Sequence, residues 1–265
     1  MEWINQLKHI SVELIKTLRG RRSVEELLEN NQTLLNPVNN YINDNYLFYD
    51  TGHFHSHYSE WRMKRIRKIL EIYGIDWEGK KILELGGYGD IGAFFAQLGA
   101  KVLSLEGRVT NVNFANLKFR NLKNFKSCVC DLEKDFTNYG RFDLIINFGL
   151  IEVIKNIDNL LECCIRMSDN IILETIVCDS TDPQKIIFVA YDTKEIDHPI
   201  SSEGSFPSPF YIEKFFKNHN FSVNRYFDED LNAKKHFYDW PHKNDNSVVR
   251  GRRRFWDFRK IKSIE

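Results

Sequence analysis

The stretch KILELGGYGDIGAFF, Lys81 to Phe95, decides how this chain folds. It begins as a short apolar run, passes through four glycines and continues as a helix-like apolar pattern. Where a parallel strand ends and its crossover helix begins, glycines let the backbone approach a ligand, and the amino end of the helix favours anionic or electron-rich groups. We therefore predict a ligand-binding turn whose glycines are Gly86, Gly87, Gly89 and Gly92.

The chain beyond this turn alternates strand-like and helix-like segments. Short apolar runs rich in β-forming residues, separated by helix-length segments, are typical of parallel strands joined by crossover helices. The expected parallel strands are 81–85, 101–105, 126–130, 142–146 and 171–177, and two terminal runs, 221–227 and 247–258, are also strand-like. The sequence therefore predicts an α/β fold.

Two other segments differ from this alternation. Residues 1–75 are expected to form a helical cap, because apolar side chains recur every three or four positions near the amino end. Residues 178–208 lack a clear period and contain three prolines and a glycine, which predicts a lid or recognition insertion. The α/β domain is expected to occupy residues 76–265.

Composition and charge exclude several classes of function. The 265 residues carry 37 basic and 37 acidic side chains, so no overall field attracts the chain to nucleic acid or to an acidic membrane. The five cysteines lack paired C-x-x-C spacing, which indicates reduced core thiols and no zinc site. The amino end has neither a signal peptide pattern nor a long apolar run, so a cytoplasmic location is expected.

Glu84, just before the glycines, indicates the charge of the ligand that the turn binds. The turn literally matches the dinucleotide fingerprint G-x-G-x-x-G. A carboxylate at this point repels a pyrophosphate, whereas it attracts a cationic ligand. S-adenosylmethionine has a cationic sulfonium and a cationic α-amino group, so Glu84 favours this cofactor. The alternative for Glu84 is a surface cap of the following helix.

Polar residues also stand at the ends of the next three strands. Glu106 is placed to accept hydrogen bonds from ribose hydroxyls, and Gly107 lets the chain pass close to them. Asp131 can bind the adenine amino group, with Leu132 or Cys130 against the ring. Asn147 to Gly149, which include Phe148, are expected to face the methionine part. Glu106 and Asp131 can alternatively be plain solubilising residues.

The motifs ILELGGYGDIG, LSLEGR, VCDL and FDLIINFGLIEVI stand in the order of successive strand ends. In this respect residues 76–265 resemble the class I S-adenosylmethionine-dependent methyltransferases. The resemblance implies a Rossmann-like, seven-stranded and mostly parallel sheet with an antiparallel last strand. Two departures stand out: Tyr88 and Asp90 replace the second and third glycines of the family pattern, and Val153 follows Glu152 where many members have a histidine.

The segment GHFHSHYSEWR contains the candidate bases. One of His53, His55 and His57 is predicted to remove the acceptor proton, with Glu152 as a further catalytic candidate. The family resemblance implies that this segment covers the cofactor. A polar loop with one histidine capping a helix is an equally open reading of the segment, and no carboxylate or cysteine set accompanies the histidines to hold a metal ion.

We therefore expect methylation, at oxygen, of a small polar metabolite or of a sugar or nucleotide-linked acceptor. Arg252, Arg253 and Arg254 are consecutive and can meet a phosphorylated acceptor or, less in keeping with the charge balance, nucleic acid. Two alternatives remain: a non-catalytic nucleoside-binding partner subunit, favoured by the altered glycine turn, and an NAD(P)-dependent oxidoreductase. The oligomeric state is left open.

Overall fold

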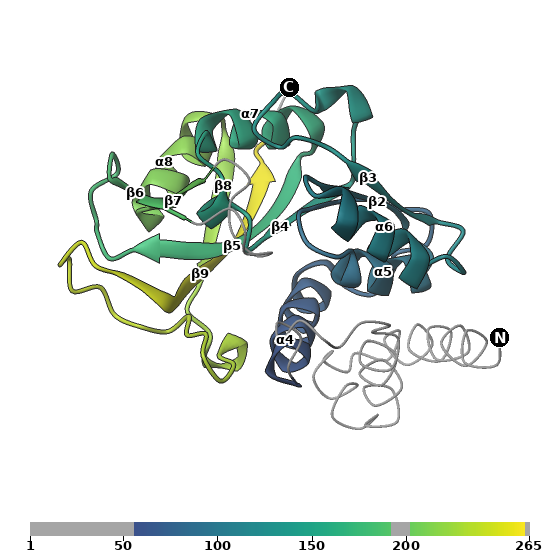
Figure 1. The fold of residues 1–265 in the computed structure, drawn as a ribbon. Coiled ribbons are helices and arrows are strands. Elements are labelled where there is room, and N and C mark those ends of the chain that lie inside the picture. Colours follow the sequence, from purple (N-terminus) through teal and green to yellow (C-terminus); the bar gives the residue numbers. More distant parts are fainter. Residues whose placement is uncertain (1–55, 192–201, 263–265) are drawn as a thin grey trace.

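The computed structural model describes residues 56–191 and 202–262, with side chains from Glu60 onward. The first described helix, α4 (Ser56–Tyr73), leads into the α/β domain (Figure 1). It ends where Gly74 takes a positive φ of 77°, a conformation that glycine adopts without steric cost. The helices expected nearer the amino end fall outside the described residues.

One seven-stranded sheet forms the centre of the fold, in the order β3-β2-β1-β4-β5-β9-β8. Its strands β1 to β5 pair in parallel, while β9 pairs antiparallel with both β5 and β8. Their bounds are β1 (Lys81–Leu85), β2 (Lys101–Glu106), β3 (Phe125–Val129), β4 (Leu144–Phe148), β5 (Asn170–Cys178), β8 (Phe221–Tyr226) and β9 (Val248–Lys260). The α/β fold with an antiparallel last strand is therefore confirmed.

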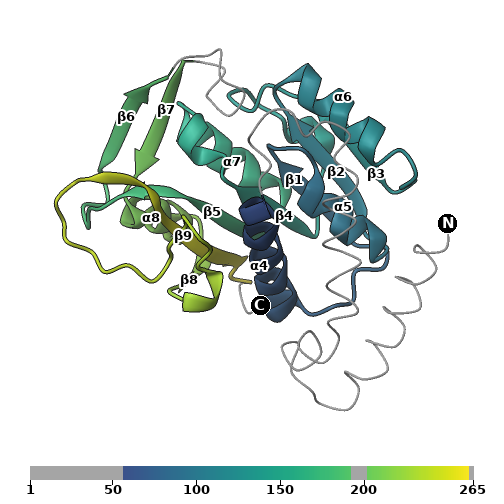
Figure 2. The ribbon, with the colours of Figure 1, turned by 60° about the horizontal axis from the view of Figure 1, so that its bottom comes forward.

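Helices cover both faces of this sheet (Figures 1 and 2). Successive strand residues point to opposite faces, so Ile82 packs with α4 and its neighbours, whereas Leu83 packs on the other side. Both side chains are fully buried, as expected for a parallel strand. The remaining helices are α5 (Asp90–Gln97), α6 (Val109–Lys118), α7 (Ile157–Met167) and α8 (Pro209–Asn218), with short 3-10 turns η2 (Thr137–Tyr139), η3 (Ile151–Val153) and η4 (Glu229–Leu231).

The 178–208 segment, expected to lack a clear period, contains two strands. Strands β6 (Ile186–Ala190) and β7 (Glu203–Pro207) form a separate antiparallel pair, which stands off the main sheet near α7 and α8 (Figure 2). The Ser205 hydroxyl of β7 donates to the carbonyls of Ile154 and Ile151 and so fixes the pair to η3. The lid or recognition role of this segment stays a prediction.

α8 begins as its sequence suggests. Ser208 Oγ accepts a hydrogen bond of 3.0 Å from Tyr211 N, and Pro209 occupies the first turn. No helix in the described part of the chain combines the length and the apolar character that crossing a membrane requires.

Candidate active site

A cleft of about 430 Å³ opens at the carboxyl ends of β1 to β4. This is the edge of an open α/β sheet at which ligands bind. One wall comes from α4, and the opposite wall comes from β9 and the segment around β6. Its lining includes Trp61, Arg62, Arg65, Tyr88, Asp90, Asn111, Gly149, Leu150, Ile176, Tyr191, His236, Arg250 and Arg253, besides most of the predicted site residues.

Glu84 lies buried beneath the turn that follows β1, with 6% of its surface exposed. Its Oε2 accepts a hydrogen bond of 3.1 Å from Gly92 N, and a side chain at Gly92 would place Cβ 2.5 Å from the same oxygen. Burial, with a contribution from the nearby Asp90 carboxylate, raises the pKa of Glu84 to about 8. Glu84 is therefore a buried brace of the helix start and not a surface cap.

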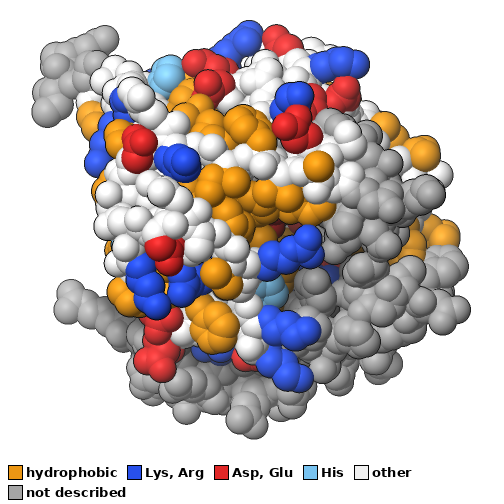
Figure 3. All heavy atoms as spheres, turned by 60° about the vertical axis from the view of Figure 1, so that its left-hand side comes forward, with side chains coloured by type: hydrophobic (Ala, Val, Ile, Leu, Met, Phe, Trp, Pro, Cys, Tyr) orange, Lys and Arg blue, Asp and Glu red, His pale blue; other side chains and the backbone are white. Residues whose placement is uncertain are grey.

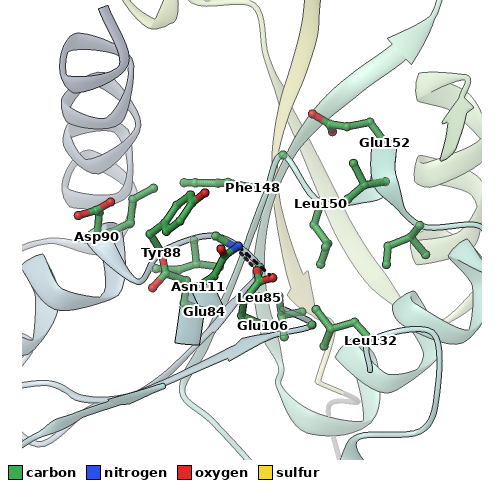
Figure 4. Close-up of a pocket in the computed structure, with 18 of the residues that line it drawn as sticks. Glu84, Leu85, Tyr88, Asp90, Glu106, Asn111, Leu132, Phe148, Leu150 and Glu152 are labelled. Atoms are coloured by element: carbon green, nitrogen blue, oxygen red, sulfur yellow. Dashed lines mark hydrogen bonds between the residues drawn. The ribbon is translucent and has the colours of Figure 1, made fainter. Parts of the chain in front are cut away.

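Glu106, at the end of β2, connects the turn to the next loop (Figure 4). Its Oε2 accepts from Gly87 N at 2.8 Å, and its Oε1 accepts from Arg108 N at 2.9 Å and from Asn111 Nδ2 at 3.3 Å. Desolvation by burial raises the pKa of this carboxyl. A carboxylate has about four acceptor positions, so three donors leave room for a ligand hydroxyl in the cleft.

The remaining predicted contacts form an apolar floor and a polar rim. Leu132 is buried, and Figure 4 shows its side chain in the pocket together with those of Leu85, Leu150 and Phe148. Asp131, about half exposed, accepts from Glu133 N at 3.1 Å and pairs with Lys134 at 3.0 Å. An apolar slot with an acidic rim suits a flat, polar-edged group such as a purine.

Two predicted cofactor residues do not line the cleft. Gly89 is the N-cap residue of α5, with a φ of 74°, and a Cβ there would lie 2.4 Å from the ring of Phe125. Asn147 is fully buried, and its side chain lies beside the Cys164 thiol of α7. The predicted residues that do line the cleft are Glu84, Gly86, Gly87, Glu106, Gly107, Asp131, Leu132, Phe148 and Glu152.

Tyr88 departs from the family pattern and lines the cleft. Its ring packs edge-on against Phe114 of α6, with 5.9 Å between ring centroids. Gly86 and Gly87, just before it, both have positive φ. An aromatic side chain therefore stands at the rim of the glycine turn, at a position where the resemblance leads us to expect glycine.

Glu152, the carboxylate candidate for catalysis, is held at both oxygens. Oε1 pairs with Arg253 Nη2 at 2.5 Å, and Oε2 accepts from Thr175 Oγ1 at 2.5 Å. Arg253 Nε also pairs with Glu174, which in turn pairs with Arg65 of α4 at 3.3 Å. The Glu152 carboxylate is thus positioned by a buried ionic network that joins β5, β9 and α4.

The predicted histidine bases cannot be compared with the cleft. His53 and His55 lie outside the described residues, and His57 belongs to α4 but its side chain is not described. A different histidine, His236, lines the cleft, where its ring stacks on Trp61 at 4.0 Å with an angle of 7°. The surrounding sequence, HFYDWPH, combines aromatic and hydrogen-bonding side chains, which is the local signal for a segment that can fold over an acceptor.

The three consecutive arginines have three different environments. Arg252 pairs with Asp179 at 3.4 Å, and Arg253 faces the cleft. Arg254 is fully buried, and its two terminal nitrogens donate to the carbonyls of Tyr238 and Trp240, each at 2.6 Å. Among the residues with described side chains, no group of three or more His, Cys, Asp or Glu is placed to hold a metal ion.

No protein-family model and no curated protein sequence matches this chain. Solved structures do match. The N-terminal domain of EvdMO1 with S-adenosylhomocysteine (SAH) bound has a TM-score of 0.60 at 18% identity, covering 85% of this chain and 96% of that one. The same domain in the presence of SAH and D-fucose has a TM-score of 0.60 at 19% identity, with the same coverage.

Magnesium protoporphyrin IX methyltransferase (ChlM) from Synechocystis PCC 6803, with bound SAH, is a further match. Its TM-score is 0.54 at 11% identity, covering 84% of this chain and 94% of that chain. At such identities the likeness concerns the fold. The class I methyltransferase fold expected from the strand-end motifs is therefore confirmed.

Proposed function

We propose that this protein is an S-adenosylmethionine-dependent methyltransferase that acts on a small polar acceptor, at oxygen. The observation that carries the proposal is Glu106, whose carboxylate joins the glycine turn to the next loop and keeps an acceptor position toward the cleft. Two vicinal ribose hydroxyls suit such a carboxylate. The SAH-bound proteins of the same fold support the choice of cofactor.

The residues of the cleft fit this cofactor by their chemistry. Asp131 and Leu132 provide a polar edge and an apolar face for adenine. Gly86 and Phe148 border the space for the methionine part, and the buried Glu84 lies under the turn, where a cationic ligand above it would favour the ionised carboxyl. An NAD(P) pyrophosphate would gain nothing from that carboxyl.

When bound, the cofactor supplies an electrophilic methyl group: the acceptor oxygen bonds the methyl carbon, the sulfur keeps the electron pair of the broken bond, and the hydroxyl proton leaves to a base. The chain's tasks are to align the acceptor and to exclude water. His236 is the described histidine that lines the cleft, and we assign it the role of proton acceptor. His53, His55 and His57 remain predicted candidates for the same role.

The acceptor that we propose is a sugar or nucleotide-linked sugar. The wall of the cleft opposite α4 contains the ion pair of Glu152 and Arg253. This pair places a hydrogen-bond acceptor and a hydrogen-bond donor side by side. Alternating donors and acceptors suit hydroxylated rings. The EvdMO1 domain studied in the presence of D-fucose supports this choice by analogy of fold.

Calorimetric titration with SAH tests the proposal. We expect one site per chain, and Glu106→Ala should weaken binding at least about tenfold, equivalent to about 1.4 kcal/mol, because the ribose acceptor and the loop brace are both lost. Glu162→Ala is the matched control, since this α7 glutamate is about half exposed and does not line the cleft.

The same titration separates the alternatives. Binding of NADH in place of SAH would identify an oxidoreductase and overturn the proposal. Absence of binding by SAH and by S-adenosylmethionine would reject it outright. Binding without methyl transfer to any sugar or nucleotide sugar would favour the non-catalytic partner subunit.

A further inference from the structure

The arm of the cleft that lies beyond the proposed cofactor site has a wall of its own. Arg253, Arg250 and Ile176 come from the paired ends of β9 and β5, Tyr191 follows β6, and Glu152 belongs to η3. Figure 3 shows the face on which β6, β7 and β9 lie, with a band of hydrophobic side chains in the middle and Lys and Arg side chains near it.

Arg253 is fixed in the deep part of this arm. Its Nη2 pairs with Glu152 and its Nε with Glu174, while no group of residues 56–191 and 202–262 accepts a hydrogen bond from its Nη1. Only 4% of the residue is exposed. The two arginines, Arg65 and Arg253, balance the two glutamates, so this part of the wall is electrically neutral and suits an uncharged hydroxyl.

The deep part lies next to the proposed methyl-transfer position. A Cβ at Gly149, which follows β4, would be 3.3 Å from Arg253 Nη2 and 3.7 Å from Glu152 Oε1. Gly149 borders the space proposed for the methionine part of the cofactor. A hydroxyl bound against the Glu152–Arg253 ion pair is therefore close to the methyl group that it would receive.

Arg250 provides charge at the mouth of the same arm. It is exposed, its guanidinium carbon lies 5.7 Å from the centroid of the Tyr191 ring, and no carboxylate of the described residues pairs with it. Unlike Arg253, it therefore keeps an uncompensated positive charge. An exposed guanidinium beside an aromatic ring suits a phosphate attached to a ring-shaped ligand.

An irregularity of β9 brings both arginines to one side. Ile176 pairs with Arg253 and Cys178 pairs with Val248, so Val177 alone faces residues 249–252 of β9. In a regular strand, residues three apart point to opposite faces. The bulge removes that alternation, and both Arg250 and Arg253 line the cleft.

Tyr191 is held against this wall by β7. Gly204 lies so close to η3 that a Cβ would be 2.2 Å from the Glu152 carbonyl oxygen and 2.8 Å from the Tyr191 ring. Tyr191 N also donates to the Ser202 carbonyl at 2.8 Å. The β6–β7 pair therefore sets the distance between the aromatic ring and the Glu152–Arg253 pair.

We propose that this arm binds a phosphorylated sugar, with the phosphate on Arg250 beside Tyr191 and the reacting hydroxyl against the Glu152–Arg253 ion pair; this rests on the proposed methyl transfer. The shared chemistry is a hydroxylated ring that carries a phosphate. A sugar phosphate and a nucleoside diphosphate sugar both provide it.

Calorimetry on the SAH-saturated protein tests the assignment with glucose, glucose 1-phosphate, ribose 5-phosphate, UDP-glucose and inorganic phosphate as probes. We expect at least one phosphorylated sugar to bind at least tenfold more tightly than glucose. Preference for glucose 1-phosphate or ribose 5-phosphate identifies a sugar phosphate, and preference for UDP-glucose identifies a nucleotide-linked sugar.

Arg250→Gln should reduce the affinity of the preferred probe at least tenfold and leave the affinity for SAH unchanged. Arg120→Gln is the matched control, because this arginine is exposed and does not line the cleft. The assignment is overturned if no phosphorylated probe binds more tightly than glucose or if Arg250→Gln binds it as the unaltered chain does. Titrating SAH alone tests the proposed function separately, since phosphate binding at Arg250 does not require the cofactor.

Discussion

Glu84→Gln tests the electrostatics beneath the glycine turn. The glutamine has the same size, and its carbonyl oxygen can still accept from Gly92 N, but it cannot ionise. In the folded chain, burial and Asp90 raise the pKa of the Glu84 carboxyl to about 8 from its ordinary 4.5. The stability that Glu84 contributes is therefore fully present below pH 4.5 and is lost as the pH rises toward 8.

The size of this loss follows from proton linkage. One unit of pKa difference corresponds to about 1.4 kcal/mol. With pKa values of 4.5 unfolded and about 8 folded, the free energy of unfolding falls by about 1 kcal/mol up to pH 5 and by about 4 kcal/mol up to pH 8. Between pH 5 and pH 8 the unaltered chain should lose about 3 kcal/mol that the Glu84→Gln variant does not lose.

Urea unfolding, followed by circular dichroism at pH 5, 6, 7 and 8, measures this difference. The free energy of unfolding of Glu84→Gln minus that of the unaltered chain should increase steadily with pH. Glu229→Gln, at an exposed carboxyl, is the matched control and should show no such trend. A constant difference for Glu84→Gln across the range would refute the reasoning, because it would mean that the amide of Gly92 keeps Glu84 ionised throughout.

Two further substitutions test the packing around the site. Gly92→Ala should lower the free energy of unfolding by about 1–3 kcal/mol, because its Cβ would meet the Glu84 carboxylate at 2.5 Å and Val102 at 2.7 Å; thermal unfolding with Ala93→Gly as a comparison measures it. Arg254→Lys should cost about 1.5–3 kcal/mol in urea unfolding, because a single lysine nitrogen cannot occupy the two separate positions from which Nη1 and Nη2 donate to the Tyr238 and Trp240 carbonyls. An unchanged midpoint in either case would contradict the assigned contacts.

The sequence predicts the parallel strands to within a few residues, most clearly where both faces of the strand are buried, as in β1, β4 and β5. In β1, all residues after Lys81 are buried, so the apolar run coincides with the strand. β6 and β7 escape prediction for the opposite reason. β6 has an apolar run, Ile186–Ala190, but is only partly buried, and its partner β7 contains Gly204 and ends at Pro207, so no second apolar run indicates what β6 pairs with.

The residues of the candidate site likewise fall into two groups: those that the sequence locates and those that it does not. Glu84, Glu106 and Asp131 follow β1, β2 and β3, and parallel strands bring their carboxyl ends to one edge, so order along the chain suffices to find them. Arg65, Tyr191 and Arg253 reach the cleft from α4, the β6–β7 segment and an antiparallel strand. Their meeting depends on long-range pairing and on a bulge, neither of which has a local sequence signal.

The two halves of the cleft are built from different kinds of structure, and the buried ionic network belongs to only one of them. The proposed cofactor half is built from loops whose amides converge on Glu84 and Glu106. The proposed acceptor half is built from paired strands and α4, joined through Glu174, which binds both Arg65 and Arg253. Breaking one partner of such a buried network leaves a charge unpaired, whereas Arg250 lies outside it and carries its charge at the mouth. Recognition of the acceptor's phosphate can therefore change at Arg250 without disturbing the groups that would align its hydroxyl.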